Sequence, residues 1–116
     1  DMSAFLTIPA AIKFQNDHNW HEVQDRCMGM IINARNEIST LTQIPKICPD
    51  EYLGQMSTII FPVNDHKVLK ETLYHTYNIE IPTYTKDGHT AFRISLQGYN
   101  SNADVETLIN ALKALL

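Results

Sequence analysis

Apolar residues from Ser3 to His18 recur at loosely helical spacing, but Pro9 interrupts them. Proline cannot donate a backbone hydrogen bond, so it kinks a helix or restarts it. We therefore expect two short helical pieces in this segment. The repeating apolar positions are Phe5, Leu6, Ile8, Ile12 and Phe14.

A long amphipathic helix is predicted over about 20–42, because apolar positions step by three or four residues along it. These positions are Trp20, Val23, Cys27, Ile31 or Met30, Ala34, Ile38 and Leu41. Asn19 is placed to cap the helix, with Glu22 three residues later completing a capping box. The only tryptophan, Trp20, is expected to anchor the helix in the core.

The stretch "QMSTIIFPV" is rich in β-branched residues and predicts a strand at about 55–61 that closes at Pro62. A turn at Asn64 and Asp65 follows it. A helix over 65–77 then has an apolar side consisting of Val68, Leu69, Leu73 and Tyr77.

A second strand, "NIEIPTYT", and a third, "TAFRISLQ", flank the sequence "KDGH". The Asp-Gly pair in that sequence is the signal for a tight hairpin turn. The last helix has Ser101 and Asp104 as its capping pair. Its apolar positions are Val105, Leu108, Ile109, Leu112, Leu115 and Leu116.

The predicted order is α-α-β-α-β-β-α, which segregates into one α+β domain over residues 1–116. We expect a small sheet of three strands, or of four, with helices packed on one face. The first two strands are joined through a helix. They are either parallel neighbours through a right-handed crossover or separated by the third strand, and the pattern does not choose between these topologies.

Net charge and the length of the apolar stretches argue against some classes of partner and location. The net charge is −4 and the nine Lys and Arg residues are scattered, which disfavours nucleic acid as a partner. No apolar stretch approaches the roughly 18 residues of a membrane helix, and the first residues lack the features of a signal peptide. We therefore expect a cytoplasmic protein without a membrane partner. The chain starts at Asp1 and Met2 and runs directly into an apolar pattern, which suggests an excised piece of a longer protein.

Neither the cysteines nor the histidines predict a metal site. Cys27 and Cys48 have no paired CxxC-type spacing, so a zinc ribbon or disulfide framework has no support. Cys27 falls on the apolar side of the long helix, where packing is its expected role. His18 and His21 lie three apart, but the proposed cap at Asn19 separates them and no third ligand is evident.

Arg93 lies in the middle of the apolar third strand. Alternation places Phe92, Ile94 and Leu96 on one face of the sheet and Arg93, Ser95 and Gln97 on the other. The apolar face belongs under the helices, so Arg93 should project from the open face. A planar guanidinium there can bind a carboxylate through two parallel hydrogen bonds. The alternative is a solvated arginine paired with Glu80 on a neighbouring strand.

The segment "FRISLQGYNSNADVETLINAL" resembles the C-terminal signature of the class V aminotransferase family, which are fold type I pyridoxal-phosphate enzymes. Arg93 and Ser95 match its Arg-x-Ser, and "YNS" at 99–101 matches its turn. "SAFLTIPAAIKFQ" and "GQMSTIIFP" are similar to the first helix and first strand of the small domain in the isopenicillin N epimerase-like branch, which stands beside the cysteine desulfurase-like members. The resemblance spans nearly the whole chain.

The resemblance implies that this chain is the C-terminal small domain of a pyridoxal 5′-phosphate enzyme, a transferase or isomerase that is homodimeric at full length. Family members use the arginine matching Arg93 to bind the α-carboxylate of an amino-acid substrate. The Schiff-base lysine, the partner of the pyridine nitrogen and the phosphate site belong to a large domain upstream. No residue of this chain is expected to be catalytic, to bind the cofactor or to bind a metal, and the fragment is expected to be inactive alone.

Several alternatives stay open. The substrate, and the choice among transamination, epimerisation and elimination, depend on residues that this chain does not contain. Cys48 does not match the desulfurase cysteine. The turn at Tyr99, Asn100 and Ser101 is expected to be structural, with Gly98 serving it. The competing function is a free-standing α+β module for ligand sensing or protein interaction, since a fold alone does not determine function.

Overall fold

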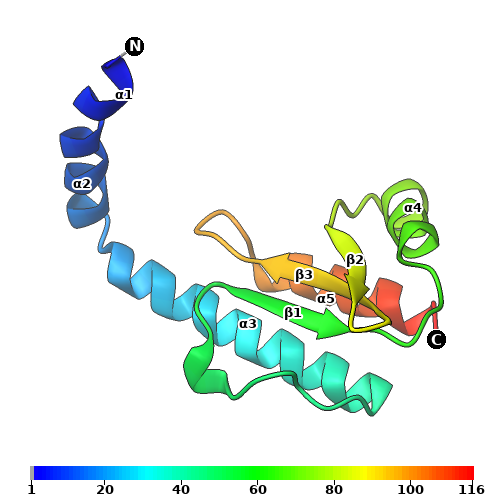
Figure 1. The fold of residues 1–116 in the computed structure, drawn as a ribbon. Coiled ribbons are helices and arrows are strands. Elements are labelled where there is room, and N and C mark those ends of the chain that lie inside the picture. The colour runs from blue at the N-terminus through cyan, green and yellow to red at the C-terminus, as the bar shows by residue number, and fades with distance from the viewer. Residues whose placement is uncertain (1) are drawn as a thin grey trace.

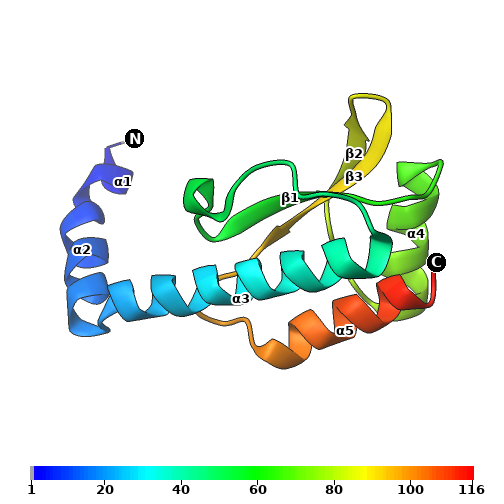
Figure 2. The same ribbon diagram turned by 90° about the horizontal axis from the view of Figure 1, so that it is seen from below.

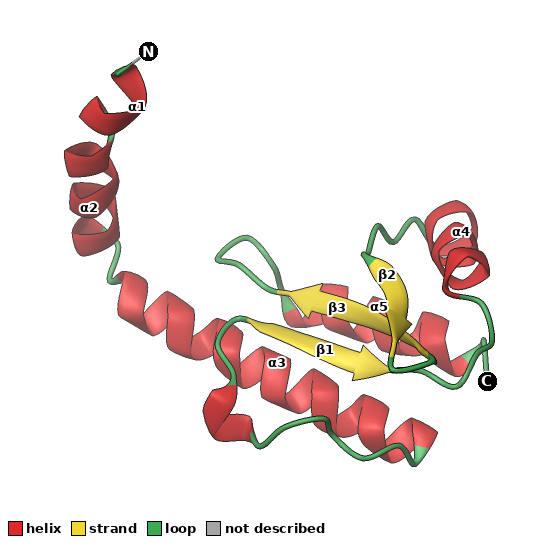
Figure 3. Cartoon of the chain, viewed as in Figure 1, coloured by secondary structure: helices red, strands yellow, loops and turns green. Residues whose placement is uncertain are grey.

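The computed structural model describes residues 2–116 and forms one α+β body with a helical extension at its N-terminus (Figures 1 and 3). Its elements are α1 (Ser3–Leu6), α2 (Ile8–Asp17), α3 (Trp20–Thr42), the 3₁₀ turn η1 (Asp50–Tyr52), β1 (Met56–Ile60), α4 (His66–Tyr77), β2 (Thr83–Lys86), β3 (His89–Ser95) and α5 (Asn102–Lys113). The predicted fold class is confirmed, and the element order holds with the first predicted helical segment divided into α1 and α2.

The three strands are arranged in the order β1-β3-β2, and both pairings are antiparallel. β3 therefore separates the first two strands, which settles the topology that the sequence left open. Thr58 of β1 lies opposite Arg93, and Tyr84 of β2 lies opposite Ala91. The central strand is thus the one that carries Arg93.

Helices α3 and α5 lie side by side under one face of the sheet, and α4 packs at the edge formed by β2 (Figure 2). The core lies between the sheet and this helical layer. Phe92 and Phe61 meet edge to face with their ring centroids 5.9 Å apart. Buried side chains of α3, α4 and α5 complete the core, among them Cys27, Ile31, Ile38, Leu73 and Leu112.

Three apolar positions of the predicted helices lie outside the core. Val68 and Leu116 are exposed, and Trp20 is only half-buried. Val68 is on the solvent side of α4, while Leu116 lies beyond the end of α5. Trp20 packs at the corner between α2 and α3, against Phe14, with ring centroids 5.7 Å apart.

The predicted break at Pro9 is confirmed, because α1 and α2 are separate pieces with the proline in the first turn of α2. The predicted capping box at the start of α3 is wrong. Asn19 has a left-handed backbone, with φ of 47°, and its side chain caps nothing. Its backbone carbonyl instead accepts a hydrogen bond from the Glu22 amide at 2.9 Å. Asn19 therefore makes the corner from which α2 projects.

The second strand begins later than predicted, at Thr83 instead of within "NIEI". Pro82 explains the late start, because proline has no amide hydrogen to donate to the sheet. The Arg93 amide donates to the Pro82 carbonyl at 3.1 Å, but Pro82 cannot return that bond. The predicted hairpin is confirmed, with φ of 50° at Asp87 and 81° at Gly88.

None of the helices within residues 2–116 combines the length and the apolar character needed to cross a membrane.

Candidate functional site

Arg93 projects from the face of the sheet opposite α3 and α5, as its strand position predicts. Arg93 and Ser95 are exposed, while their neighbours Phe92 and Ile94 are buried under the helices. Thr58 of β1 lies opposite Arg93. The two residues form a non-hydrogen-bonded pair, the arrangement in which side chains of neighbouring strands come closest. The guanidinium is thus mounted on the middle strand, with a hydroxyl beside its base.

Two hydroxyl groups form a hydrogen bond across this open face. The Thr58 Oγ1 and the Tyr84 hydroxyl are 2.6 Å apart, although their strands flank β3 on opposite sides. Ala91, the β3 residue opposite Tyr84, is fully buried, and its small side chain leaves room for the tyrosine. The open face beside Arg93 therefore carries a fixed pair of hydroxyls.

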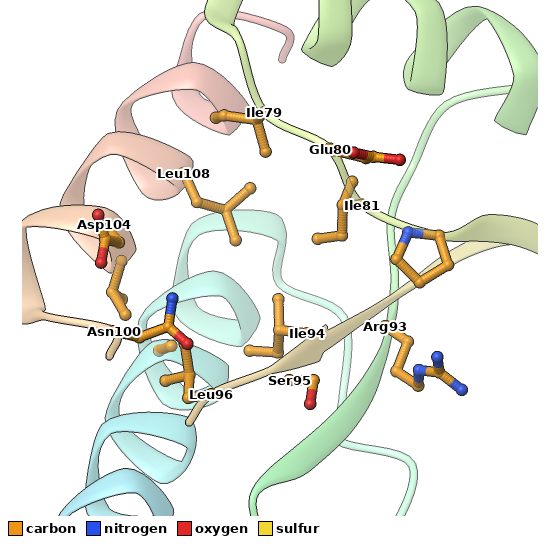
Figure 4. Close-up of a pocket in the computed structure, with 13 residues that line it drawn as sticks. Ile79, Glu80, Ile81, Arg93, Ile94, Ser95, Leu96, Asn100, Asp104 and Leu108 are labelled. Atoms are coloured by element: carbon orange, nitrogen blue, oxygen red, sulfur yellow. The ribbon is translucent and has the colours of Figure 1, made fainter. Parts of the chain in front are cut away.

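Arg93 makes no ion pair or side-chain hydrogen bond with any residue in the described range 2–116. The alternative pairing with Glu80 is not found. Glu80 lies in the extended segment before β2, outside the ladder, and its side chain points away from the guanidinium (Figure 4). The five N–H donors of Arg93 are therefore available to an external acceptor.

A cavity of about 240 Å³ opens at the edge of β3, where Ile79–Pro82 diverges from the strand. Its walls are mostly apolar and include Ile81, Ile94, Leu96 and Leu108. Arg93 reaches its rim, but the guanidinium points away from it (Figure 4). A carboxylate on the guanidinium would thus lie on the open face and not in this cavity.

The turn after β3 is held onto α3 by groups that the sequence did not single out. Arg26 donates to the backbone carbonyls of Gly98 at 3.1 Å and Asn100 at 3.2 Å. A Cβ added at Gly98 would lie 3.1 Å from Val23 Cγ1 and 3.2 Å from Trp20. Gly98 is therefore needed for close packing. Its φ is not positive, which corrects the role in turn geometry expected for it.

The predicted capping pair at the start of α5 is confirmed. The Ser101 amide donates to Asp104 Oδ2 at 2.8 Å, and the Ser101 hydroxyl donates to the same oxygen at 3.2 Å. The backbone hydrogen bond from Ser101 holds the pKa of Asp104 below its ordinary value. These contacts support the structural role expected for the turn.

Arg35 is a buried charged residue that the sequence pattern did not single out. It lies in the buried side of α3 and is 2% exposed. Its guanidinium donates to the Cys48 carbonyl at 3.0 Å and pairs with Asp50. The hydrogen bond from Arg35 holds the pKa of Asp50 below its ordinary value. The signal was present, because residue 35 falls at helical spacing among Ile31, Ala34 and Ile38.

The lysines offer no setting suited to a reactive amine. Lys86 is the one nearest to the hydroxyl pair along β2, and it pairs with Asp87 at 2.9 Å. That hydrogen bond raises the pKa of Lys86, whereas a reactive amine needs a lowered pKa. Lys13, Lys46, Lys67, Lys70 and Lys113 lie at the surface. Residues 2–116 contain no group of three His, Cys, Asp or Glu side chains placed to hold a metal ion.

Known proteins that are similar to this chain over almost its whole length include two enzymes. The chain is 26% identical over 118 aligned positions to isopenicillin N epimerase from Amycolatopsis lactamdurans, covering 99% of this chain and 30% of the epimerase. The expected resemblance is confirmed. No protein-family model matches the chain.

The fold is also that of part of a solved enzyme, the 8-amino-7-oxononanoate synthase from Francisella tularensis. The TM-score is 0.68 at 17% identity, over 91% of this chain and 31% of the synthase. The chain thus spans less than a third of the epimerase and of the synthase. The chain is thus similar in sequence to part of one enzyme and in fold to part of another.

Proposed function

We propose that this chain is the C-terminal small domain of a pyridoxal-phosphate-dependent enzyme of the class V aminotransferase type, in which Arg93 binds the substrate α-carboxylate. The supporting observation is an arginine that projects from the open face of the central strand and has no side-chain partner among residues 2–116. The substrate would be an amino acid or a compound derived from one. The full-length protein would be a homodimeric, cytoplasmic enzyme.

The proposal places the cofactor site outside this chain. The lysine nearest to the Thr58–Tyr84 hydroxyl pair along β2 is ion-paired, its pKa is raised, and the other lysines lie at the surface. Pyridoxal 5′-phosphate would therefore be bound by a larger upstream domain. When bound, it supplies an electron sink for the carbon next to the carboxylate.

The role of Arg93 in this proposal is positioning. A guanidinium fixes a carboxylate with two parallel hydrogen bonds, which sets both the location and the orientation of the substrate. Orientation is a substantial part of the lowering of a reaction barrier. Ser95, next along the same face, and the Thr58–Tyr84 hydroxyl pair supply neutral donors close to the same place. The ligand would therefore be bound by a charged contact supported by hydroxyl groups.

The first test is the complete reading frame that encodes this chain. It should continue upstream for several hundred residues and include a lysine at the end of a predicted strand. A reading frame that begins near Met2 would favour the free-standing module instead.

The second test is the substitution Arg93→Ala in the full-length enzyme. It should lower kcat/KM, because the substrate carboxylate loses its charged partner. The corresponding loss of transition-state stabilisation is about 2 to 5 kcal/mol. Thermal stability should stay unchanged, since Arg93 has no side-chain partner to lose within the described part of the chain. Lys70→Ala, which removes one exposed positive charge on α4, is the matched control and should have little effect. An unchanged kcat/KM in the arginine variant would refute the assignment.

A further inference from the structure

The hydrogen bond between Thr58 and Tyr84 leaves one hydroxyl hydrogen unused. The two oxygens are 2.6 Å apart, and either one can be the donor. Each hydroxyl has one hydrogen to donate, and the bond between them uses only one of the two. Within residues 2–116 neither hydroxyl has another hydrogen-bond partner. One O–H of this hydroxyl pair is therefore free to donate, whichever way the bond runs.

The free hydrogen lies beside the guanidinium of Arg93. Thr58 is directly opposite Arg93, in a non-hydrogen-bonded pair of the antiparallel sheet. Cβ atoms of two residues in such a position are about 4.5 to 5.5 Å apart. The guanidinium itself has no side-chain partner in the described part of the chain. One small ligand can therefore contact both the guanidinium and the hydroxyl pair.

The strands around these groups favour an anion. All three strands lie within the described residues, and none of them contains an aspartate or a glutamate. This holds although the whole chain has a net charge of −4. Lys86, the other Lys or Arg residue of the strands, already pairs with Asp87. No carboxylate of the strands thus competes with an external one for Arg93.

We propose that the Thr58–Tyr84 hydroxyl pair is a second contact for the carboxylate that Arg93 binds. This inference rests on the proposed function, and it adds two defined residues and one defined hydrogen to that site. A carboxylate has about four lone-pair positions, and a guanidinium that binds both oxygens uses two of them. The spare O–H donates to a third position, on the oxygen nearer to β1. The ligand is thus a carboxylate that is held from two sides.

Either hydroxyl can make this contact. Because the two oxygens are 2.6 Å apart, an acceptor that reaches one of them lies close to the other. In Tyr84→Phe, Thr58 keeps its own hydrogen and loses only its partner. In Thr58→Val, the same is true of Tyr84. Carboxylate binding should therefore weaken little in each single variant and strongly in the double variant, which has no donor left.

The free energy of unfolding should follow the opposite pattern. Each single substitution already breaks the hydrogen bond between the two side chains, so the second substitution has little more to remove. A pair that only links the outer strands would therefore show its whole effect at the first substitution. A pair that also binds the ligand loses that contact at the second. Comparing the two patterns separates a binding role from a structural one.

The test measures how acetate protects Arg93 from phenylglyoxal in the polypeptide encoded by the complete reading frame. Phenylglyoxal modifies exposed guanidinium groups, and mass spectrometry of the peptide that contains Arg93 gives the rate at constant ionic strength. Acetate should slow the modification, whereas acetamide, its neutral counterpart, should not. The acetate concentration for half-protection should rise at least about tenfold in the double variant Thr58→Val with Tyr84→Phe, as expected for the loss of a hydrogen bond to a charged group.

Two further variants make this result specific. Thr85→Val removes an exposed hydroxyl from the other face of β2 and should leave the protection unchanged. Thr58→Ser combined with Tyr84→Phe restores one hydroxyl to the double variant. It should bind acetate like the single variants, although the link between the strands stays broken. Circular dichroism shows that each variant is folded.

Three outcomes would overturn the second contact. The first is a folded double variant that acetate protects as well as the original protein, which leaves the role of Arg93 intact. The second is a full loss in either single variant, since the effect would then follow the broken link between the strands. The third is a failure of acetate to protect Arg93 even in the original protein. That result would also reject the carboxylate site of the proposed function, so the two failures are distinguishable.

Discussion

Thr58 and Tyr84 join the two outer strands of the sheet through a hydrogen bond of 2.6 Å that passes across the central strand. No backbone hydrogen bond can link β1 to β2, because β3 lies between them. The two side chains therefore link the outer strands directly, which the backbone hydrogen bonds of the sheet do not do. They do so on the face that also carries Arg93.

Removing either hydroxyl should destabilise the protein, because it removes this hydrogen bond. Tyr84→Phe is expected to lower the free energy of unfolding by about 1 kcal/mol, the usual net value of one hydrogen bond. Urea denaturation measures this loss. Combining Tyr84→Phe with Thr58→Val should cost less than the sum of the two single changes, since both remove the same bond. Tyr99→Phe, at an exposed position in the turn, is the control and should leave the free energy unchanged. Additive losses would show that the hydroxyls do not interact in solution.

The ion pair between Arg35 and Asp50 predicts a loss of stability in acid. Arg35 lowers the pKa of Asp50 in the folded state, so this pair contributes stability above the ordinary carboxyl pKa of 3.8. That contribution should disappear as the pH falls through the lowered pKa. Thermal unfolding at pH values from 6 to 2 measures the effect. Asp50→Asn should flatten part of the pH profile. A variant with the same profile as the original protein would contradict the pairing.

Gly98→Ala should destabilise the protein, because its new methyl group would press on Val23 and Trp20. The cost of such overpacking is about 1 kcal/mol, and Gly98→Val should cost more. Because Trp20 is the only tryptophan, its fluorescence should report the displacement directly. Gly54→Ala is the control, since nothing lies within 4 Å of its added Cβ. An unchanged emission spectrum in both Gly98 variants would argue against this contact.

Gly88→Ala should weaken the hairpin between β2 and β3. The backbone there has φ of 81°, a conformation that costs an L-residue with a side chain about 1 to 2 kcal/mol. Chemical denaturation measures the loss. No side-chain contact is involved, because nothing lies within 4 Å of the added Cβ. Gly88→Asn should be milder, as asparagine tolerates the left-handed region better than alanine does. Equal costs for the two variants would point to some cause other than backbone strain.

Local signals in the sequence predicted the elements that depend on local chemistry. The Asp-Gly pair specified the hairpin, Pro9 specified the break between α1 and α2, and Ser101 with Asp104 specified the start of α5. Alternation along β3 also predicted the side from which Arg93 projects. These predictions succeeded because each depends on a few neighbouring residues.

Features that depend on distant contacts were not predictable in this way. The position of β3 between β1 and β2 depends on the pairing of residues far apart in the chain. Arg35 was passed over because a charge on a buried face is unusual, and its acceptors come from the loop after α3. Trp20 was assigned to the core on hydrophobicity alone, although it packs at a corner instead. The choice of Arg93 as a substrate-binding residue stays a prediction.

Pro82 marks the point at which the pairing between β2 and β3, the strand that carries Arg93, ends. At Ala91 and Phe92, β3 is paired with both neighbouring strands, whereas Ile94 and Ser95 are paired only with β1. Arg93 lies where the pairing with β2 ends. Its amide donates to the carbonyl of Pro82, which has no amide hydrogen to donate in return. The backbone of Arg93 is thus hydrogen-bonded beside Ala91 and Phe92, the two residues of β3 that have a strand on each side, and this position fixes where the guanidinium leaves the sheet.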